Sequence, residues 1–289
     1  MLLETFNRFD DFELLDTGDG QRLERWGKYI LARPDPQIIW PRHLNGAQWA
    51  KSDAIFESRA DKGQWHIKTP VPKSWLINYN NKIKLVAKLS PFKHTGIFPE
   101  QAAQWDWLEK ALANTSRLKI LNLFAYTGGA TMVLTKLGHG VTHVDASKPA
   151  LAWAKENQAA NNFAPDSIRW ILDDAAKFVK RELKRGQTYD GIIMDPPAFG
   201  HSPSGKTWKF NQDLPSLLND CVELLSPNAK FLIINGYATN SSAISLQNVL
   251  QDAVANRTGK IDFGELCLKQ KDARLISTGI FARWSPLDK

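Results

Sequence analysis

The tract Asp195-Pro196-Pro197-Ala198-Phe199 contains the residue types with the clearest chemistry in this chain of 289 residues. It follows the apolar segment 189–194, which has the length and composition of a buried strand. Because proline has no backbone N–H, two prolines leave carbonyl oxygens free to accept hydrogen bonds. The Asp195 carboxylate and the Pro196 carbonyl can therefore hold an amino nitrogen of a substrate, with Phe199 stacked on its ring. The competing interpretation is a Pro-Pro turn with a core phenylalanine.

A glycine turn between an apolar strand, 119–125, and a helical pattern, 128–137, is a second candidate site. Glycine has no Cβ and a helix start offers unpaired N–H groups, so such a turn can bind either a phosphate or a carboxylate. The residues predicted to line the cofactor here are Phe124, Ala125, Tyr126, Thr127, Gly128 and Gly129.

Asp145 ends the next predicted strand, 141–145, seventeen positions after Gly128. A carboxylate there can accept both hydroxyls of an adenosine ribose, a feature shared by NAD and S-adenosylmethionine sites. The chain lacks the G-x-G-x-x-G pattern that cradles a pyrophosphate, which favours S-adenosylmethionine. Ala146 and Ser147 complete this part of the predicted cofactor site. The alternative is that Asp145 caps the following helix.

Asp173-Asp174-Ala175 follows the third predicted strand, 168–172. An acid at this position can accept a hydrogen bond from the adenine amino group, and we assign that role to Asp174 with Ala175 beside it. Asp174 is equally suited to be the N-cap of the helix predicted over 174–184.

The tract 200–207 matches the phosphate-binding pattern G-x-x-x-x-G-K-[ST] letter for letter. Its context is poor, because the preceding strand ends at Met194, before Gly200, and residues 208–211 with Pro215 do not open a helix directly after Thr207. We therefore predict a flexible basic loop beside the substrate, with Pro197, Lys206 and Trp208 as substrate contacts.

Strands and helices alternate from residue 119 onward, which predicts a parallel sheet covered on both faces. Further predicted strands are 230–235, 261–268 and 275–284, and further predicted helices are 100–112, 149–161, 212–225 and 241–255. The last two strands have no helix between them, so they are expected to close the parallel sheet as an antiparallel pair. The fold class is therefore α/β: a doubly wound, mostly parallel, seven-stranded Rossmann-like sheet.

A small β-rich module precedes this sheet and is predicted to be antiparallel, which gives two domains, 1–90 and 91–289. Residues 21–95 hold fourteen Lys and Arg against five Asp and Glu, a net charge of +9, interleaved with tryptophan and tyrosine. Basic residues among aromatics suit phosphate contacts and base stacking in RNA. The alternative is a module whose tryptophans form its own core.

From about Lys93 onward the chain resembles class I methyltransferases that make 5-methylcytosine or 7-methylguanine in bacterial 23S rRNA, and their uncharacterised relatives. The motifs that carry the resemblance are Thr95–Gln101, Asn122–Gly129, Val144–Ser147 and Asp195–Phe199. The resemblance implies that Phe98 and Gln101 help close over S-adenosylmethionine and that the β-rich module contacts RNA. An arginine expected after Gln101 is replaced here by Ala102.

Cytosine-C5 methylation needs a cysteine nucleophile, and none follows Pro197 or the fifth predicted strand. The two cysteines, Cys221 and Cys267, are interpreted as structural. We therefore expect methylation of a base nitrogen in RNA, with rRNA favoured. Two alternatives stay open: a protein or small-molecule N-methyltransferase, and a non-catalytic RNA-binding protein that keeps the fold.

The composition adds expectations about location and partners. No apolar run reaches the roughly 18 residues of a membrane span, and the N-terminus lacks the pattern of a secretory signal. Two cysteines are too few for a disulfide framework or a metal cluster. A cytoplasmic enzyme without a metal is expected, and the sequence does not indicate its oligomeric state.

Overall fold

The contacts within the chain group it into two compact units. The structure, a computed structural model, describes residues 1–59, 62–201 and 207–286. The larger unit consists of residues 1–4, 105–266 and 277–289, and the smaller unit of residues 5–104 and 267–276. The predicted division into an RNA-contacting module, 1–90, and a methyltransferase domain, 91–289, stays a prediction.

The larger unit is built on an eight-stranded sheet with the order β1-β16-β17-β15-β12-β9-β10-β11. Its strands are β1 (Leu2–Glu4), β9 (Lys119–Leu123), β10 (Gly140–Asp145), β11 (Ile168–Leu172), β12 (Gly191–Met194), β15 (Phe231–Gly236), β16 (Lys260–Lys269) and β17 (Leu275–Ser285). Strands β9 to β12 and β15 pair in parallel, and β17 is antiparallel to β15. The predicted doubly wound α/β fold is confirmed.

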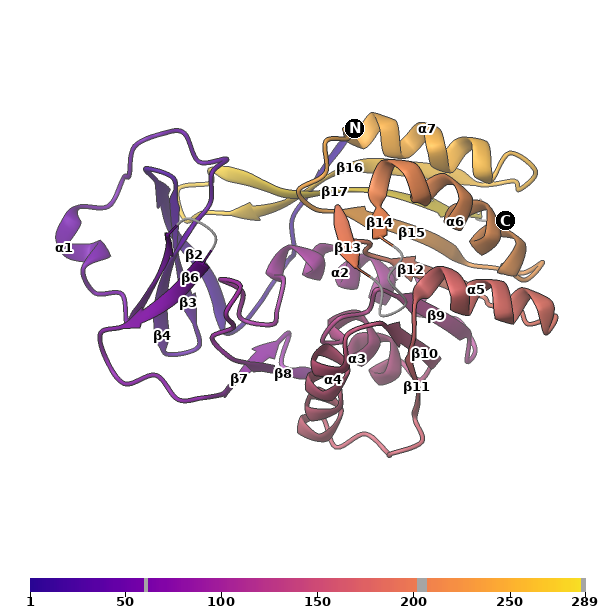
Figure 1. Ribbon diagram of the computed structural model, residues 1–289, viewed down its shortest axis with the longest axis horizontal. Coiled ribbons are helices and arrows are strands. Elements are labelled where there is room, and N and C mark those ends of the chain that lie inside the picture. The colour runs from indigo at the N-terminus through magenta and orange to yellow at the C-terminus, as the bar shows by residue number, and fades with distance from the viewer. Residues whose placement is uncertain (60–61, 202–206, 287–289) are drawn as a thin grey trace. The chain divides into compact units, whose positions relative to one another are not determined.

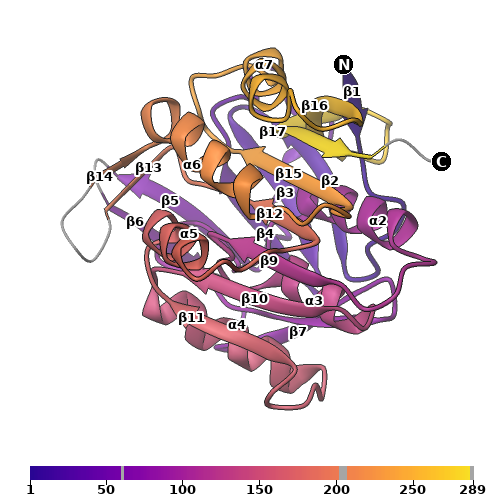
Figure 2. The same cartoon turned by 90° about the vertical axis from the view of Figure 1, so that its right-hand side faces the viewer.

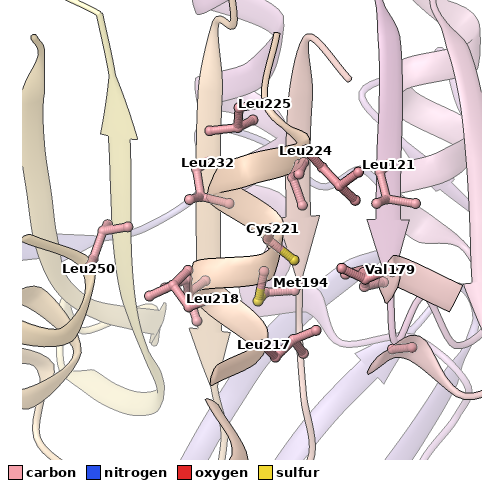
Figure 3. Close-up of a cluster of buried hydrophobic side chains, with 14 of the residues drawn as sticks. Leu121, Val179, Met194, Leu217, Leu218, Cys221, Leu224, Leu225, Leu232 and Leu250 are labelled. Atoms are coloured by element: carbon pink, nitrogen blue, oxygen red, sulfur yellow. The ribbon is translucent and has the colours of Figure 1, made fainter. Parts of the chain in front are cut away.

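Helices cover both faces of this sheet (Figures 1 and 2). One face carries α5 (Ala175–Lys184), α6 (Phe210–Leu224) and α7 (Ala243–Ala253), and the other carries α2 (Ala102–Ala111), α3 (Gly129–Lys136) and α4 (Lys148–Ala160). Figure 3 shows the core beneath the first layer, where Val179, Leu218 and Cys221 point at strand residues such as Met194. Cys221 and Cys267 are both buried and neither forms a disulfide bond, which agrees with a structural role.

The predicted elements of the larger unit are present, with ends shifted by a few residues. The strand predicted over 119–125 ends at Leu123, because Phe124 has a positive φ of 52° and leaves the sheet. The helix predicted over 212–225 begins at Phe210 and contains Pro215 in its second turn. One strand of the main sheet was not predicted: β1 adds to its edge, in parallel with β16, so that Leu2 lies opposite Gly264.

The smaller unit contains a five-stranded sheet, a two-stranded sheet and two short helical turns. Its elements are β2 (Phe12–Gly18), β3 (Gln21–Trp26), β4 (Tyr29–Pro34), α1 (Gly46–Trp49), β5 (Ala54–Arg59), β6 (Lys62–Ile67), β7 (Trp75–Tyr79), β8 (Ile83–Ala87) and η1 (Pro99–Gln101). The expectation of a purely antiparallel module is wrong at one pair, because β4 and β5 run parallel. The chain between them forms α1, whose Asn45–Gln48 capping box the sequence analysis missed.

Candidate cofactor and substrate site

The loop that follows β9 has an unusual backbone. Phe124, Tyr126 and Gly128 all have positive φ, of 52°, 50° and 81°. Non-glycine residues in this region carry strain that a fold retains mainly at functional sites. Within this loop, the N–H groups of Ala125, Tyr126 and Gly128 donate to the Val144 carbonyl, the Asp145 carboxylate and the Ala125 carbonyl, which holds the loop in shape. Helix α3 starts at Gly129 with no side-chain cap among the described residues, so its first N–H groups suit an anion.

Asp145 lies next to this loop, at the carboxyl end of β10. Its Oδ2 accepts the backbone N–H of Tyr126 at 2.7 Å, and its Oδ1 accepts that of Ser147 at 2.8 Å. Burial raises the pKa of the Asp145 carboxyl, and the two N–H donors offset part of that rise. A carboxylate has about four lone-pair sites, so capacity remains for hydroxyl donors. The structure therefore brings the predicted residues 124–129 and 145–147 together.

The two glycines of the turn serve different purposes. Gly128 supplies the left-handed conformation before α3. A Cβ on Gly129 would lie 2.4 Å from Cζ2 of Trp105 on α2, so this glycine is required by packing. From the sequence, both glycines were expected to allow close approach by a ligand, and the contact of Gly129 with Trp105 was not predicted.

A buried polar layer supports the loop from below and was missed in the sequence. Asn122 on β9 donates its side-chain N–H to Thr131 Oγ1 at 2.9 Å, and Thr131 Oγ1 lies 3.0 Å from His143 Nδ1. Burial lowers the pKa of His143 to about 3, so the imidazole is neutral. Asn157 on α4 donates to the Thr127 carbonyl at 2.8 Å. The only signal in the sequence was polar residues at otherwise apolar positions, and it does not show which of them meet.

Asp173 and Asp174 follow β11 and lie at the same edge of the sheet. The backbone N–H of Asp173 donates to the Asp145 carbonyl at 3.1 Å. Asp174 is the N-cap of α5, and its Oδ1 accepts the Lys177 N–H at 3.0 Å. The N-cap interpretation of Asp174 is confirmed, with Ala175 buried behind it. Its predicted contact with adenine would use the second carboxylate oxygen, and stays a prediction.

The Asp-Pro-Pro tract leaves β12 beside the glycine loop. The backbone N–H of Asp195 donates to the carbonyl of Leu123, the last residue of β9, at 3.4 Å. Phe199 follows on β13 (Phe199–His201) and is 56% exposed. An exposed ring next to the end of a central strand is available for stacking on a planar substrate.

Trp208 connects this tract to the glycine loop. It lies on β14 (Thr207–Lys209), which pairs antiparallel with β13 and places Trp208 opposite Gly200. Its Nε1 donates to the Pro197 carbonyl at 2.7 Å, and its ring lies 5.2 Å from that of Phe124 between centroids. The predicted loop is a strand pair at its two ends, so Gly200 does not lie in a strand-to-helix phosphate loop. Lys206 lies outside the described residues.

Phe98 and Gln101 belong to the smaller unit. Phe98 is the N-cap of η1, and its carbonyl accepts the Gln101 N–H at 3.1 Å. Its ring packs against His94, with 4.9 Å between the centroids. Ala102, at the position where the resemblance led us to expect an arginine, is fully buried. The predicted closure of these residues over the cofactor stays a prediction.

The tryptophans of residues 21–95 are held inside the smaller unit. All five donate their indole N–H to the protein: Trp26 to Glu24, Trp40 to Thr17, Trp49 to Asp16, Trp65 to Ser90 and Trp75 to Trp26. Trp26 and Trp49 are buried. The interpretation as core residues is therefore confirmed for these two, whereas Trp40, Trp65 and Trp75 are half-buried.

Part of the basic excess is also internal. Arg33 makes a bidentate pair with Glu24, at 2.7 and 3.0 Å, and Arg22 lies 3.3 Å from the same carboxylate. These three side chains are almost completely buried, and the arginines hold the pKa of Glu24 low despite its burial. Two of the fourteen basic residues are therefore unavailable to phosphates.

No cluster of three or more His, Cys, Asp or Glu side chains suited to a metal ion occurs within residues 1–59, 62–201 and 207–286. In the same part of the chain, no helix is long and apolar enough to cross a membrane.

Comparison with known proteins agrees with the geometry. Residues 52–267 match a family described as S-adenosylmethionine-dependent methyltransferase. A solved structure of a SAM-dependent methyltransferase from Agrobacterium tumefaciens is 37% identical, with a TM-score of 0.95, and the match covers 99% of this chain and 94% of that chain.

Two curated relatives match the chain over shorter stretches. Ribosomal RNA large subunit methyltransferase I of Photobacterium profundum is 31% identical over 201 residues, which cover 67% of this chain and 48% of that protein. Ribosomal RNA large subunit methyltransferase K/L of Shewanella frigidimarina is 30% identical over 182 residues, which cover 59% of this chain and 24% of that protein. The match thus spans about half of the first relative and about a quarter of the second.

Proposed function

Because the chain belongs to the S-adenosylmethionine-dependent methyltransferase family, we propose that it methylates a base nitrogen of RNA, with large-subunit ribosomal RNA as the favoured substrate. The observation that carries the RNA assignment is the similarity to two relatives named as methyltransferases of that RNA. A cytoplasmic location, where ribosomes are accessible, is part of the proposal.

The residues at the carboxyl edge of the sheet fit this cofactor. The uncapped start of α3 suits the carboxylate of its methionine part, and Asp145 suits the ribose hydroxyls. The bound cofactor supplies a methyl group that its sulfonium already activates. What the protein must add is therefore alignment of the acceptor and removal of a proton.

Asp195, Pro196 and Phe199 supply the acceptor side of the proposal. The Asp195 carboxylate and the Pro196 carbonyl accept hydrogen bonds from the amino nitrogen, which directs the nitrogen lone pair away from them and toward the methyl group. Phe199 stacks on the base. A stacked base inside a helix cannot reach this pocket, so the target nucleotide is flipped out or unpaired.

A nitrogen acceptor agrees with the positions of the two cysteines. Attack on cytosine C6 needs a thiolate close to the base. Cys221 lies in the core under α6, and burial raises the pKa of its thiol far above the ordinary value. Cys267 is buried in β16, in the part that belongs to the smaller unit. Neither thiol suits nucleophilic attack on a base.

The test is methyl transfer from tritiated S-adenosylmethionine to transcribed, unmodified large-subunit ribosomal RNA, followed by mass spectrometry of the digested nucleosides. The proposal expects a base methylated on nitrogen, lost in Asp195→Ala although cofactor binding by calorimetry is retained. A 5-methylcytosine product would contradict the nitrogen assignment. Binding of RNA and cofactor without any transfer, in wild type and variant alike, would favour a non-catalytic RNA-binding protein.

A protein side chain or a small molecule is the alternative acceptor, since an Asp-Pro-Pro-aromatic pocket suits any planar amine or amide. The burial of Arg22 and Arg33 favours it, because it reduces the charge that argued for RNA. Failure of the wild-type protein to retain RNA at physiological salt would support this alternative.

A further inference from the structure

Helix α5 of the larger unit carries a basic stripe, defined here as Lys177, Lys180, Arg181, Lys184 and Arg185. The spacing i, i+3, i+4, i+7 places the first four on one face of the helix, and Arg185 is its C-cap. All five side chains are exposed. From the first to the last the helix rises about 12 Å, at 1.5 Å per residue.

The opposite face of α5 fixes the orientation of the stripe. Ala175, Phe178 and Val179 are buried in the core, so the helix cannot rotate without losing that packing. Glu182, the one acid among residues 177–185, also points inward. It accepts the Tyr189 hydroxyl at 2.7 Å and pairs with Arg169 at 3.0 Å and Arg185 at 3.1 Å.

The charge of this helix layer is segregated. α6 lies beside α5 on the same face of the sheet (Figure 2). It carries Asp213, Asp220 and Glu223 and no lysine or arginine, and α7 carries only Asp252. A surface helix that needs only solubility mixes both signs of charge. The concentration of one sign on α5 therefore indicates a partner of the opposite sign.

The three lysines of the stripe are available for such a partner. Within the described residues Lys177, Lys180 and Lys184 have no ion pair or hydrogen bond through their side chains, whereas Arg181 pairs with Asp173 and Arg185 with Glu182. Their ammonium groups are point charges on flexible stems, which suit phosphates spaced along a strand.

The stripe adjoins a groove at the amino ends of β9 to β11. The groove has a volume of about 400 Å³ and is lined by Arg117, Lys119 and Arg169, together with Asp166 and Asp190. Arg169 and the stripe residue Arg185 share Glu182, which joins groove and stripe. The Asp190 carboxylate is occupied by the Lys119 backbone N–H at 2.9 Å and by the Ser226 hydroxyl at 2.8 Å. Lys119 Nζ donates to Gln187 at 2.7 Å and Arg169 is paired with Glu182, so the exposed Arg117 and Asp166 are the charged groups that the groove presents most openly.

We propose that the basic stripe of α5 binds the phosphate backbone of the RNA whose base is methylated beside Asp195. Asp174, the N-cap of α5, follows the carboxyl end of β11, so the stripe begins at the edge of the sheet where Asp145 and Asp195 lie. It then leads away from that edge along the helix. The inference rests on the proposed function, and it locates an RNA contact in the larger unit.

The test compares two triple variants. Lys177→Gln/Lys180→Gln/Lys184→Gln removes three charges from the stripe and keeps residues with similar helix propensity. Lys110→Gln/Lys136→Gln/Lys155→Gln removes three exposed charges from α2, α3 and α4, on the other face of the sheet. Binding of transcribed large-subunit ribosomal RNA is measured by filter retention over a series of salt concentrations, with S-adenosylmethionine affinity and thermal stability measured in parallel.

For the stripe variant we expect RNA affinity at least tenfold weaker than wild type. The slope of log K against log salt should become shallower by about 2, at about 0.7 for each lost contact with single-stranded RNA. Cofactor affinity and thermal stability should be unchanged, and the control variant should bind RNA like wild type. If the two variants have equal RNA affinity and slope while the wild type still binds and methylates RNA, the role of the stripe is wrong and the proposed function stands. A wild-type protein that neither binds nor methylates RNA would overturn the proposed function, and the stripe with it.

Discussion

At the scale of single residues, Asp145 has the most constrained chemistry. Its two oxygens tie Tyr126 to Ser147 through backbone N–H groups, which sets the shape of the cofactor loop before any ligand binds. The ionised form makes these contacts, yet burial raises its pKa. Folding therefore favours the protonated form of this group, and its contribution to stability is lost as the pH rises through the raised pKa. The pH dependence of cofactor binding has the opposite sign, because the ionised carboxylate is the form that accepts hydrogen bonds from the ribose.

We expect S-adenosylmethionine affinity to fall as the pH drops from neutral through the raised pKa of Asp145, because protonation removes an acceptor for the ribose hydroxyls. The decline should begin above the ordinary aspartate pKa of 3.8. Calorimetric titration over a pH series measures it. Asp145→Asn should bind weakly at every pH, without this dependence, and a variant with the pH profile of wild type would show that another group is responsible.

Trp208 permits a second test at this scale. Trp208→Phe keeps an aromatic ring near Phe124 and loses the hydrogen bond to the Pro197 carbonyl, worth about 0.5–1.5 kcal/mol. We expect kcat to fall several-fold while cofactor affinity is unchanged, because the bond orders the substrate tract. Trp170→Phe is the matched control, since the Trp170 Nε1 has no partner among the described residues. Equal kcat in the two variants would remove the positioning role of Trp208.

At the scale of elements, the packing of α2 on the start of α3 can be tested through Gly129. Gly129→Ala introduces a Cβ that lies 2.4 Å from Trp105 Cζ2, an overpacking that costs about 1–3 kcal/mol. We expect a lower melting temperature by calorimetry and weaker cofactor binding. Gly46→Ala should be nearly neutral, since its Cβ meets no described atom within 4 Å.

The clash explanation predicts coupling between the two helices. The cost of Gly129→Ala should be smaller in a Trp105→Phe background, because the smaller ring vacates the space. Additive costs would mean that the alanine acts through the backbone instead.

The elements could be predicted where a local pattern determines them. β12 is a continuous apolar run, and β9 is apolar except for Lys119 and Asn122; such strands become central parallel strands. β1 has only three residues, and its place depends on Gly264, where a Cβ would lie 1.9 Å from the Leu2 carbonyl oxygen. That pairing joins residues far apart in the sequence, so no local pattern predicts it. The hairpin that carries Trp208 was hidden by a chance match to a phosphate-loop pattern.

At the scale of the whole molecule, the composition indicated how many basic residues there are but not which of them can reach a partner. The excess in residues 21–95 includes Arg22 and Arg33, which neutralise Glu24 inside the smaller unit. The stripe on α5 was visible in the sequence as Lys177 to Arg185, yet its meaning depends on two facts of packing. Glu182 turns inward, and the neighbouring helix α6 is acidic. Burial decides which charges can act on a partner, and burial is a property of the fold.

Among the predicted cofactor contacts, Phe98 and Gln101 belong to the smaller unit. If they close over the cofactor, S-adenosylmethionine should slow amide hydrogen exchange in residues 94–102 as well as in 123–130 and 145–148 of the larger unit, because binding suppresses local opening. Mass spectrometry of peptic peptides with and without the cofactor measures this. Strands β2 and β3 should exchange alike in both states and serve as the internal control. Protection limited to the two segments of the larger unit would show that the cofactor is held there alone, and the role inferred for Phe98 and Gln101 would be wrong.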